Sequence, residues 1–177
     1  MRRLLCIAIA LIMLSGLQAC NSNPRKAKNY NDKTPVDDSG ASFIKDAVES
    51  SLSEVKFSNL AQKNSQNREI RDFAKTMITD HGEFEKVLRK IADNKNINVS
   101  DSVNFEHQQL ANSLARKTEH DFDKEYIQVI VNDHEKTLKL YREAATNSDK
   151  DVKKWASATV AKIEEHLKKA NALCARF

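Results

Sequence analysis

Helix-breaking residues are almost absent from most of this chain, and this constrains its fold more than any other feature. From residue 41 to residue 177 there is no proline, and the one glycine is Gly82. The whole chain has 3 glycines and 2 prolines, where average usage gives roughly 12 and 9 at this length. β-Sandwiches, barrels and glycine-rich phosphate loops need more turn residues than this. The sequence therefore predicts long helices joined by short polar turns.

The first twenty residues look like a targeting signal. Arg2 and Arg3 precede an apolar run, Leu4 to Leu14, that is too short to cross a bilayer as a stable helix. The run leads into a segment that resembles the bacterial lipoprotein signal, with leucine three positions before a cysteine and a small residue directly before it: Leu17-Gln18-Ala19-Cys20. The resemblance implies cleavage after residue 19 and a lipid on the sulfur of Cys20, which would anchor the chain to a membrane. The alternative is an ordinary secretory signal with a coincidental cysteine.

The residues after the cysteine indicate a tether and an address. Asn21 follows the cysteine where inner-membrane lipoproteins carry an acidic residue, so we expect the outer membrane, facing the periplasm. Residues 20–40 are polar, contain both prolines and predict a disordered tether. The domain is expected to span residues 41–177.

Charge and cysteine counts exclude some partners and bonds. Removal of Arg2 and Arg3 with the signal lowers the formal net charge from +4 to +2. Such a balanced domain has no electrostatic basis for binding nucleic acid. After cleavage and lipidation, Cys174 is the single remaining thiol, which excludes an intramolecular disulfide. We expect Cys174 to be a small apolar residue on the last helical turn.

Hydrophobic periodicity divides the domain into helices. Four long helices are predicted at 42–63, 68–94, 122–146 and 150–175, with a shorter one at 103–117. The short polar turns make two helical hairpins, and the segment between them is long enough to cross the bundle. This order predicts an all-α, ferritin-like four-helix bundle whose long crossover carries a short extra helix. A cytokine-type or plain up-down bundle is the alternative.

Polar residues interrupt the apolar seams of the four long helices at similar heights. Glu54, His81, His134 and His166 each lie on the seam of a different helix, close to its middle. We expect these four side chains to meet in the core. His107 and His120 flank the crossover, and we expect them in solvent.

Four segments carry a resemblance to a known family: Glu54 to Ala61, Phe73 to His81, Phe122 to His134 and Trp155 to Leu167. The most specific is the Met-Ile-x-Asp-His motif that begins at Met77. From about Ala41 to Leu173 the chain resembles the bacterial envelope family catalogued as domain of unknown function 4142, often labelled predicted outer membrane protein. The resemblance implies a ferritin-like bundle and no established reaction.

Two hypotheses explain the polar layer. The first is a mononuclear site for one divalent ion of zinc, copper or iron, held by Glu54, His81, His134 and His166. Supporting side chains would come from the neighbouring acids and core tyrosines: Asp80, Asp133, Tyr126 and Tyr141. A di-iron enzyme is not expected, because no histidine has a glutamate three residues before it.

The second hypothesis is a buried polar network without metal, in a non-catalytic module with a binding or structural role. Carboxylate or hydroxyl groups would then satisfy the histidines, and the candidate hydroxyl partners are Tyr126, Tyr141, Thr137 and Thr159. Both hypotheses place the domain in the cell envelope through the anchor at Cys20. Neither specifies a protein partner or an oligomeric state.

Overall fold

The computed structural model describes residues 34–177, which form five helices and no strand. The helices are α1 (Asp38–Asn64), α2 (Arg68–Asn94), α3 (Phe105–Leu114), α4 (Glu119–Ala144) and α5 (Lys150–Cys174). The expected all-α class is confirmed. The predicted signal, Cys20 and most of the predicted tether lie outside the described residues.

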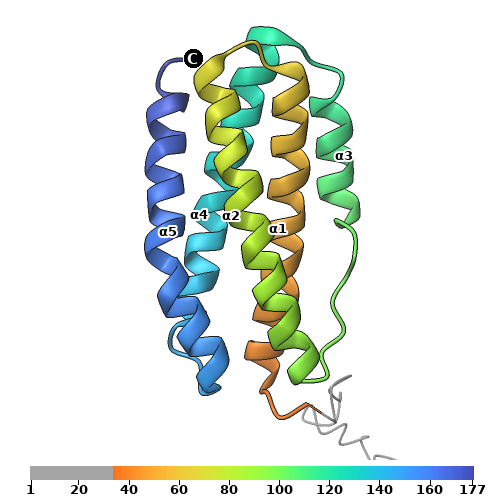
Figure 1. The fold of residues 1–177 in the computed structure, drawn as a ribbon, viewed down its shortest axis with the longest axis vertical. Helices are drawn as coiled ribbons and strands as arrows, with labels where there is room; N and C mark the ends of the chain where they lie inside the picture. Colours follow the sequence, from red (N-terminus) through yellow and green to blue (C-terminus); the bar gives the residue numbers. More distant parts are fainter. Residues whose placement is uncertain (1–33) are drawn as a thin grey trace, which may run out of the picture. The chain divides into compact units, whose positions relative to one another are not determined.

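The four long helices form a bundle of two antiparallel hairpins, α1 with α2 and α4 with α5 (Figure 1). After α2 the chain climbs back along the bundle, and α3 lies beside α1 before α4 descends. As a result α2 and α4, the second and third of the four long helices, run in the same direction. In a plain up-down bundle, consecutive long helices run in opposite directions. This long crossover confirms the ferritin-like arrangement.

Asparagine and aspartate side chains begin the helices where the polar turns predicted them. The Asn67 side chain accepts a hydrogen bond from the amide of Glu69 at 2.9 Å, so α2 begins at residue 68. Asp149 accepts from the amides of Asp151 and Val152, both at 3.0 Å, at the start of α5. These bonds satisfy amides that have no partner within the helix.

Helix α1 begins at Asp38, inside the stretch expected to be a disordered tether up to residue 40. Asp37 makes the difference, because its carboxylate accepts from the amide of Gly40 at 2.7 Å and from the hydroxyl of Ser148 at 2.8 Å. The side-chain amide of Asn147 also donates to this carboxylate, at 3.2 Å. These donors, Gly40 first, hold the pKa of Asp37 well below its ordinary value. The cap thus depends on residues about 110 positions away.

The buried apolar side chains form two clusters, one toward each end of the bundle. The first includes Phe57, Met77 and Tyr126, and the second includes Ile44 and Leu88. On each long helix, the polar seam residue falls in the sequence between members of the two clusters. The core therefore consists of two apolar halves with a polar layer between them.

The short helix is shorter than predicted and buries few of its residues. Helix α3 spans ten residues rather than the expected 103–117, and Ala111 and Leu114 are its buried residues. Phe105 was expected on the apolar face of this helix, but it is 79% exposed. It is the first residue of α3, and the buried residues of α3, Ala111 and Leu114, lie in the second half of the helix. Within residues 34–177, no helix combines the length and apolar character needed to cross a membrane.

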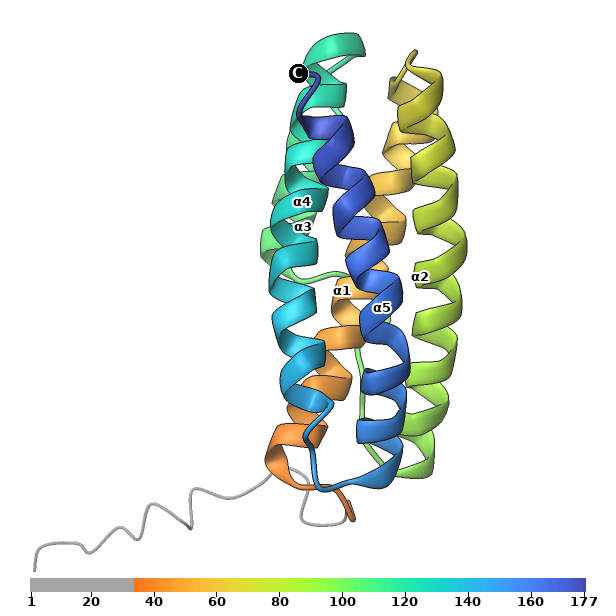
Figure 2. The ribbon, with the colours of Figure 1, turned by 90° about the vertical axis from the view of Figure 1, so that its left-hand side faces the viewer.

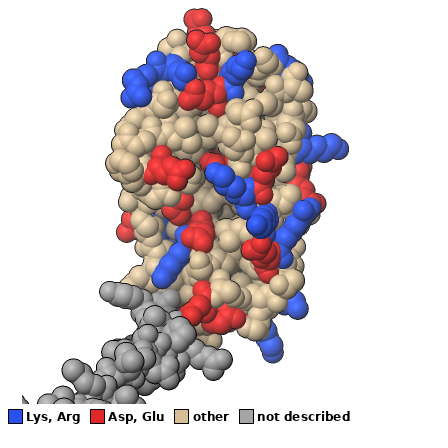
Figure 3. Space-filling view, turned by 180° about the vertical axis from the view of Figure 1, so that it is seen from behind, with Lys and Arg blue, Asp and Glu red and all other residues tan. Residues whose placement is uncertain are grey.

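The face opposite to that of Figure 1 carries interspersed charges. Lys and Arg side chains alternate there with Asp and Glu, and neither sign gathers over a large area of this view (Figure 3). The pattern agrees with the nearly balanced charge of the domain.

A candidate metal centre in the bundle core

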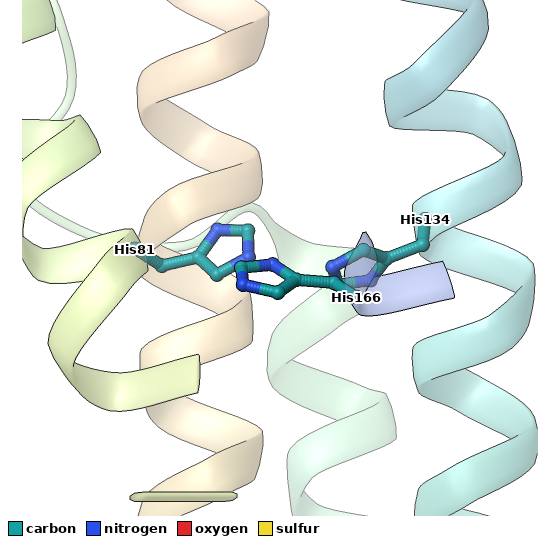
Figure 4. Close-up of side chains that lie close together, drawn as sticks. All are labelled: His81, His134 and His166. Carbon is teal, nitrogen blue, oxygen red and sulfur yellow. The ribbon is translucent and has the colours of Figure 1, made fainter. Parts of the chain in front are cut away.

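Three histidines from three helices converge in the middle of the bundle. His81 on α2, His134 on α4 and His166 on α5 are 1%, 0% and 3% exposed. One ring nitrogen of each lies within 4.8 Å of the others. The rings point toward a common centre from their separate helices (Figure 4). The seam positions thus bring together three of the four residues predicted to bind an ion.

Four ring nitrogens of these three histidines make no hydrogen bond within the described residues. They are Nε2 of His134, Nδ1 of His166 and both ring nitrogens of His81. Buried polar atoms in proteins are nearly always paired, and an unpaired one costs stability. Four such atoms in one place are therefore a feature that requires a physical explanation.

Asp80 orients His166. Its Oδ2 lies 2.8 Å from Nε2 of His166, so the ring donates through Nε2 and leaves the lone pair of Nδ1 toward the centre. A carboxylate on the outer nitrogen is the usual support of a metal-binding histidine. Asp80 directly precedes His81 on α2, yet it contacts a histidine of another helix, because successive helical side chains point in different directions.

His134 is oriented by α1 and by its own helix. Its Nδ1 lies 3.0 Å from the carbonyl oxygen of Ile130 and 3.1 Å from Oε1 of Glu54. A proton on Nδ1 serves the Ile130 carbonyl and leaves the lone pair of Nε2 toward the centre. Neither oxygen of Glu54 has a hydrogen-bond partner in the described part of the chain, so Glu54 acts on the ring as a nearby charge. Glu54 itself is fully buried but stands behind His134 rather than among the converging nitrogens.

Burial acts on the charge of all three rings. It lowers the pKa of His81 well below the ordinary value, and the two neighbouring histidines lower it further. Burial also lowers the pKa of His166, and His134 adds to this, although Asp80 opposes it. For His134, burial is opposed by the Glu54 carboxylate, which leaves the pKa raised. His81 and His166 are thus held in the neutral form that can coordinate a metal.

The other predicted supporting residues lie away from the centre. Asp133 points to α3, where its Oδ2 is 3.8 Å from Nε2 of His107. The Tyr126 hydroxyl bonds to Ser58 Oγ at 3.0 Å. Tyr141 packs edge-on against Phe43, with ring centroids 5.0 Å apart. Of the four, Asp80 alone contacts one of the three histidines.

His107 is not in solvent as expected. It is half-buried, its Nδ1 lies 2.7 Å from Oε1 of Glu49, and its ring packs edge-on against Phe57. The reason is that α3 docks on α1 and carries His107 with it. The Glu49 carboxylate accordingly raises the pKa of His107. His120, by contrast, is exposed as predicted.

Two residues beside the centre, Phe84 and Gly82, differ in what the structure shows for them. The ring of Phe84 contacts His81 edge-on at 5.2 Å and stacks on His166 at 6.3 Å, measured between centroids. Its spacing identified it as an apolar residue but not as a cover for the histidines. Gly82, which follows His81, is in helical backbone, and a Cβ there would meet nothing within 4 Å. No close approach requires this glycine.

Three inward-facing imidazoles can hold one transition-metal ion. Bonds of about 2.0–2.1 Å to zinc require the nitrogens to move closer than the 4.8 Å that now bounds their separations. Three protein ligands leave a fourth position of a tetrahedral ion open.

Comparison with known proteins supports the fold and names the family. A crystal structure of a DUF305 fragment from Deinococcus radiodurans is similar, with a TM-score of 0.72 and 10% sequence identity, over 81% of this chain and 99% of that one. At this identity the likeness shows the fold alone. A search of curated proteins gives no match. The family described as "Domain of unknown function (DUF4142)" matches residues 25–173, and the chain therefore belongs to it.

Proposed function

We propose that this protein binds a single divalent transition-metal ion in its bundle, through His81, His134 and His166, and that a lipid on Cys20 holds it in the cell envelope. The observation that carries the metal proposal is the convergence of buried, unpaired nitrogens from three helices within 4.8 Å. Imidazole ligands suit zinc, copper and iron. The role is binding of the ion rather than catalysis.

The alternative, a polar network without metal, finds partners for only part of the histidine layer. Three of the expected hydroxyl groups are bonded elsewhere: Thr137 to Ser50, Thr159 to the carbonyl of Trp155, and Tyr126 to Ser58. Carboxyl groups stand behind two histidines, Asp80 behind His166 and Glu54 behind His134. The remaining ring nitrogens, including both of His81, have no hydrogen-bond partner among the described residues, and an ion would satisfy the inward ones together.

The charges around the layer also favour a dication. Neutral imidazoles bring no negative charge to the ion, but a carboxylate stands behind each of two ligands: Asp80 behind His166, and Glu54 behind His134. A buried charge is tolerated when it is compensated nearby. Burial raises the pKa of Glu54, and a cation bound in front of His134 would favour its ionised form. Ionised, the two carboxyl groups match the charge of one divalent ion.

Measurement of bound metal tests this proposal. The full chain, purified from membranes in detergent, is expected to contain or take up one Zn²⁺ per molecule, quantified by elemental analysis and calorimetric titration. His134→Leu should abolish binding, and His120→Leu, which alters an exposed histidine, should leave it unchanged. Absence of binding by the unsubstituted chain, or equal loss in both variants, would overturn the proposal.

Membrane attachment is tested separately. The support for it is the lipoprotein-like segment that ends at Cys20. Cys20→Ser is expected to release the chain from the membrane fraction, while Cys174→Ser leaves it bound. Continued attachment of Cys20→Ser would show that the anchor is something else.

A further inference from the structure

One side of the histidine layer is open to a groove. A cleft of about 620 Å³ runs between α2 and α5, and His166 forms part of its lining together with Phe73, Thr76, Lys169 and Ala172. Figure 2 shows α2 and α5 separating toward the end of the bundle where α5 finishes. The groove therefore connects the surface to a side chain of the candidate centre.

Asp80 lies four residues after Thr76 on α2 and is bonded to His166, which lines the groove. Its side chain is 25% exposed, and its Oδ2 is 2.8 Å from the buried Nε2 of His166. The acids that line the groove are each paired with a basic side chain: Glu165 with Lys162 at 2.9 Å, Asp72 with Arg68 at 3.7 Å, and Glu69 with Arg176. Asp80 is thus a partly exposed carboxylate in contact with a ligand of the centre.

Side chains cover two other sides of the layer. A second groove, of about 310 Å³, lies between the same helices toward the opposite end and is lined by Trp155 and Ala158. There the Phe84 ring covers His81 and His166, and Trp155 packs edge-on against Phe84 with centroids 5.8 Å apart. On the far side, His134 is 0% exposed and backed by Glu54.

We propose that the groove lined by Thr76 and Ala172 is the access route of the centre: a hydrated divalent cation enters it, meets the carboxylate of Asp80 and passes to the histidines. The inference rests on the proposed metal binding and adds the side of the bundle from which the ion enters. Because this is the side on which solvent reaches a ligand, the groove controls how fast the ion exchanges. It does not control how tightly the ion is held at equilibrium.

A pair of matched substitutions on α5 tests the route. Ala172 and Ala158 are both exposed and line the two different grooves. Ala172→Trp, alone and with Thr76→Trp, fills the proposed route, and Ala158→Trp fills the other groove. The probe is Co²⁺, whose absorption bands report coordination by imidazole, mixed with the full chain in a stopped-flow instrument.

The route predicts a change in rate without a change in affinity. Filling the first groove should slow Co²⁺ association and dissociation together, by about tenfold or more, with the dissociation constant and the stoichiometry unchanged. Ala158→Trp should leave both rates as they are. Circular dichroism and the melting temperature verify that each variant is folded.

The contrary outcomes are distinct. Slowing by Ala158→Trp but not by Ala172→Trp would place access on the other side, and no slowing by any variant would mean that the ion enters by opening of the bundle. Either result overturns the route and leaves metal binding intact. Failure of the unsubstituted chain to bind Co²⁺ or Zn²⁺ would overturn the proposed function itself.

Discussion

Two regions of the same core treat buried polar groups in opposite ways. At the interface of α1 and α4, Ser58 pairs with Tyr126 at 3.0 Å and Ser50 with Thr137 at 2.9 Å. In the layer shared by α2, α4 and α5, four histidine ring nitrogens have no hydrogen-bond partner within residues 34–177. The hydroxyl pairs satisfy each other. The histidine layer leaves buried nitrogens unsatisfied, and our proposal is that an ion completes it.

The largest expected effect is stabilisation of the bundle by metal. At a free Zn²⁺ concentration 100 times the dissociation constant, the free energy of unfolding should rise by about 2.7 kcal/mol. The rise should appear as a higher melting temperature, reversed by a chelator and absent in His134→Leu. An equal rise in that variant would mean that Zn²⁺ stabilises the chain without binding the histidine layer.

The next effect concerns the support of His166. Asp80→Ala is expected to weaken Zn²⁺ binding by about 10–100-fold, because the ring loses the carboxylate that fixes its tautomer. Calorimetric titration measures the affinity. Asp72→Ala, an exposed position two turns earlier on α2, is the matched control and should bind as tightly as the original chain.

A paired hydroxyl should matter for stability but not for metal. Tyr126→Phe removes the bond to the buried Ser58 hydroxyl and is expected to lower the free energy of unfolding by about 1 kcal/mol. Urea denaturation measures the loss. Altered Zn²⁺ affinity in this variant would mean that the hydroxyl pairs and the histidine layer are coupled.

Substitution of Gly82, next to His81, tests whether this position contributes to metal binding. Its backbone is helical and its surroundings are open, so Gly82→Ala should stabilise the metal-free chain by about 0.5–1 kcal/mol. Gly40→Ala is the opposing control, since a Cβ there would lie 2.5 Å from Cγ1 of Val36. Weaker Zn²⁺ binding by Gly82→Ala would extend the site to this position.

The smallest effect is the most direct contrast with Tyr126→Phe. His81 makes no hydrogen bond with the described residues, so in metal-free protein His81→Leu should change the free energy of unfolding by less than about 1 kcal/mol. The same variant should lose Zn²⁺ binding. A loss of several kcal/mol without metal would instead identify His81 as an ordinary structural residue.

Sequence periodicity predicted the parts of the fold that depend on one helix at a time. The seam spacing correctly predicted that His81, His134 and His166 face the core. The count of residues from the turn between α4 and α5 also placed His134 and His166 near one level, as the structure shows. The Asn67 and Asp149 caps could likewise be anticipated, because each acts on its own first helical turn.

Contacts between distant segments were beyond the reach of periodicity. The partner of Asp80 is His166, which depends on how α2 and α5 face each other. The burial of His107 depends on the packing of α3 against α1. Helix α3 has few apolar residues, so its sequence does not predict which side packs. Glu54 was placed at the correct level, but only the packed helices show that it stands behind a ligand.

The cap of α1 has a mechanical consequence. Asp37 joins the first turn of α1 to Asn147 and Ser148 in the turn between α4 and α5. A pull on the chain that precedes α1 therefore reaches both hairpins at once and does not simply peel α1 away from α2. In a protein held by a lipid at Cys20, as we propose, tension would be shared by the whole bundle at the point where it starts.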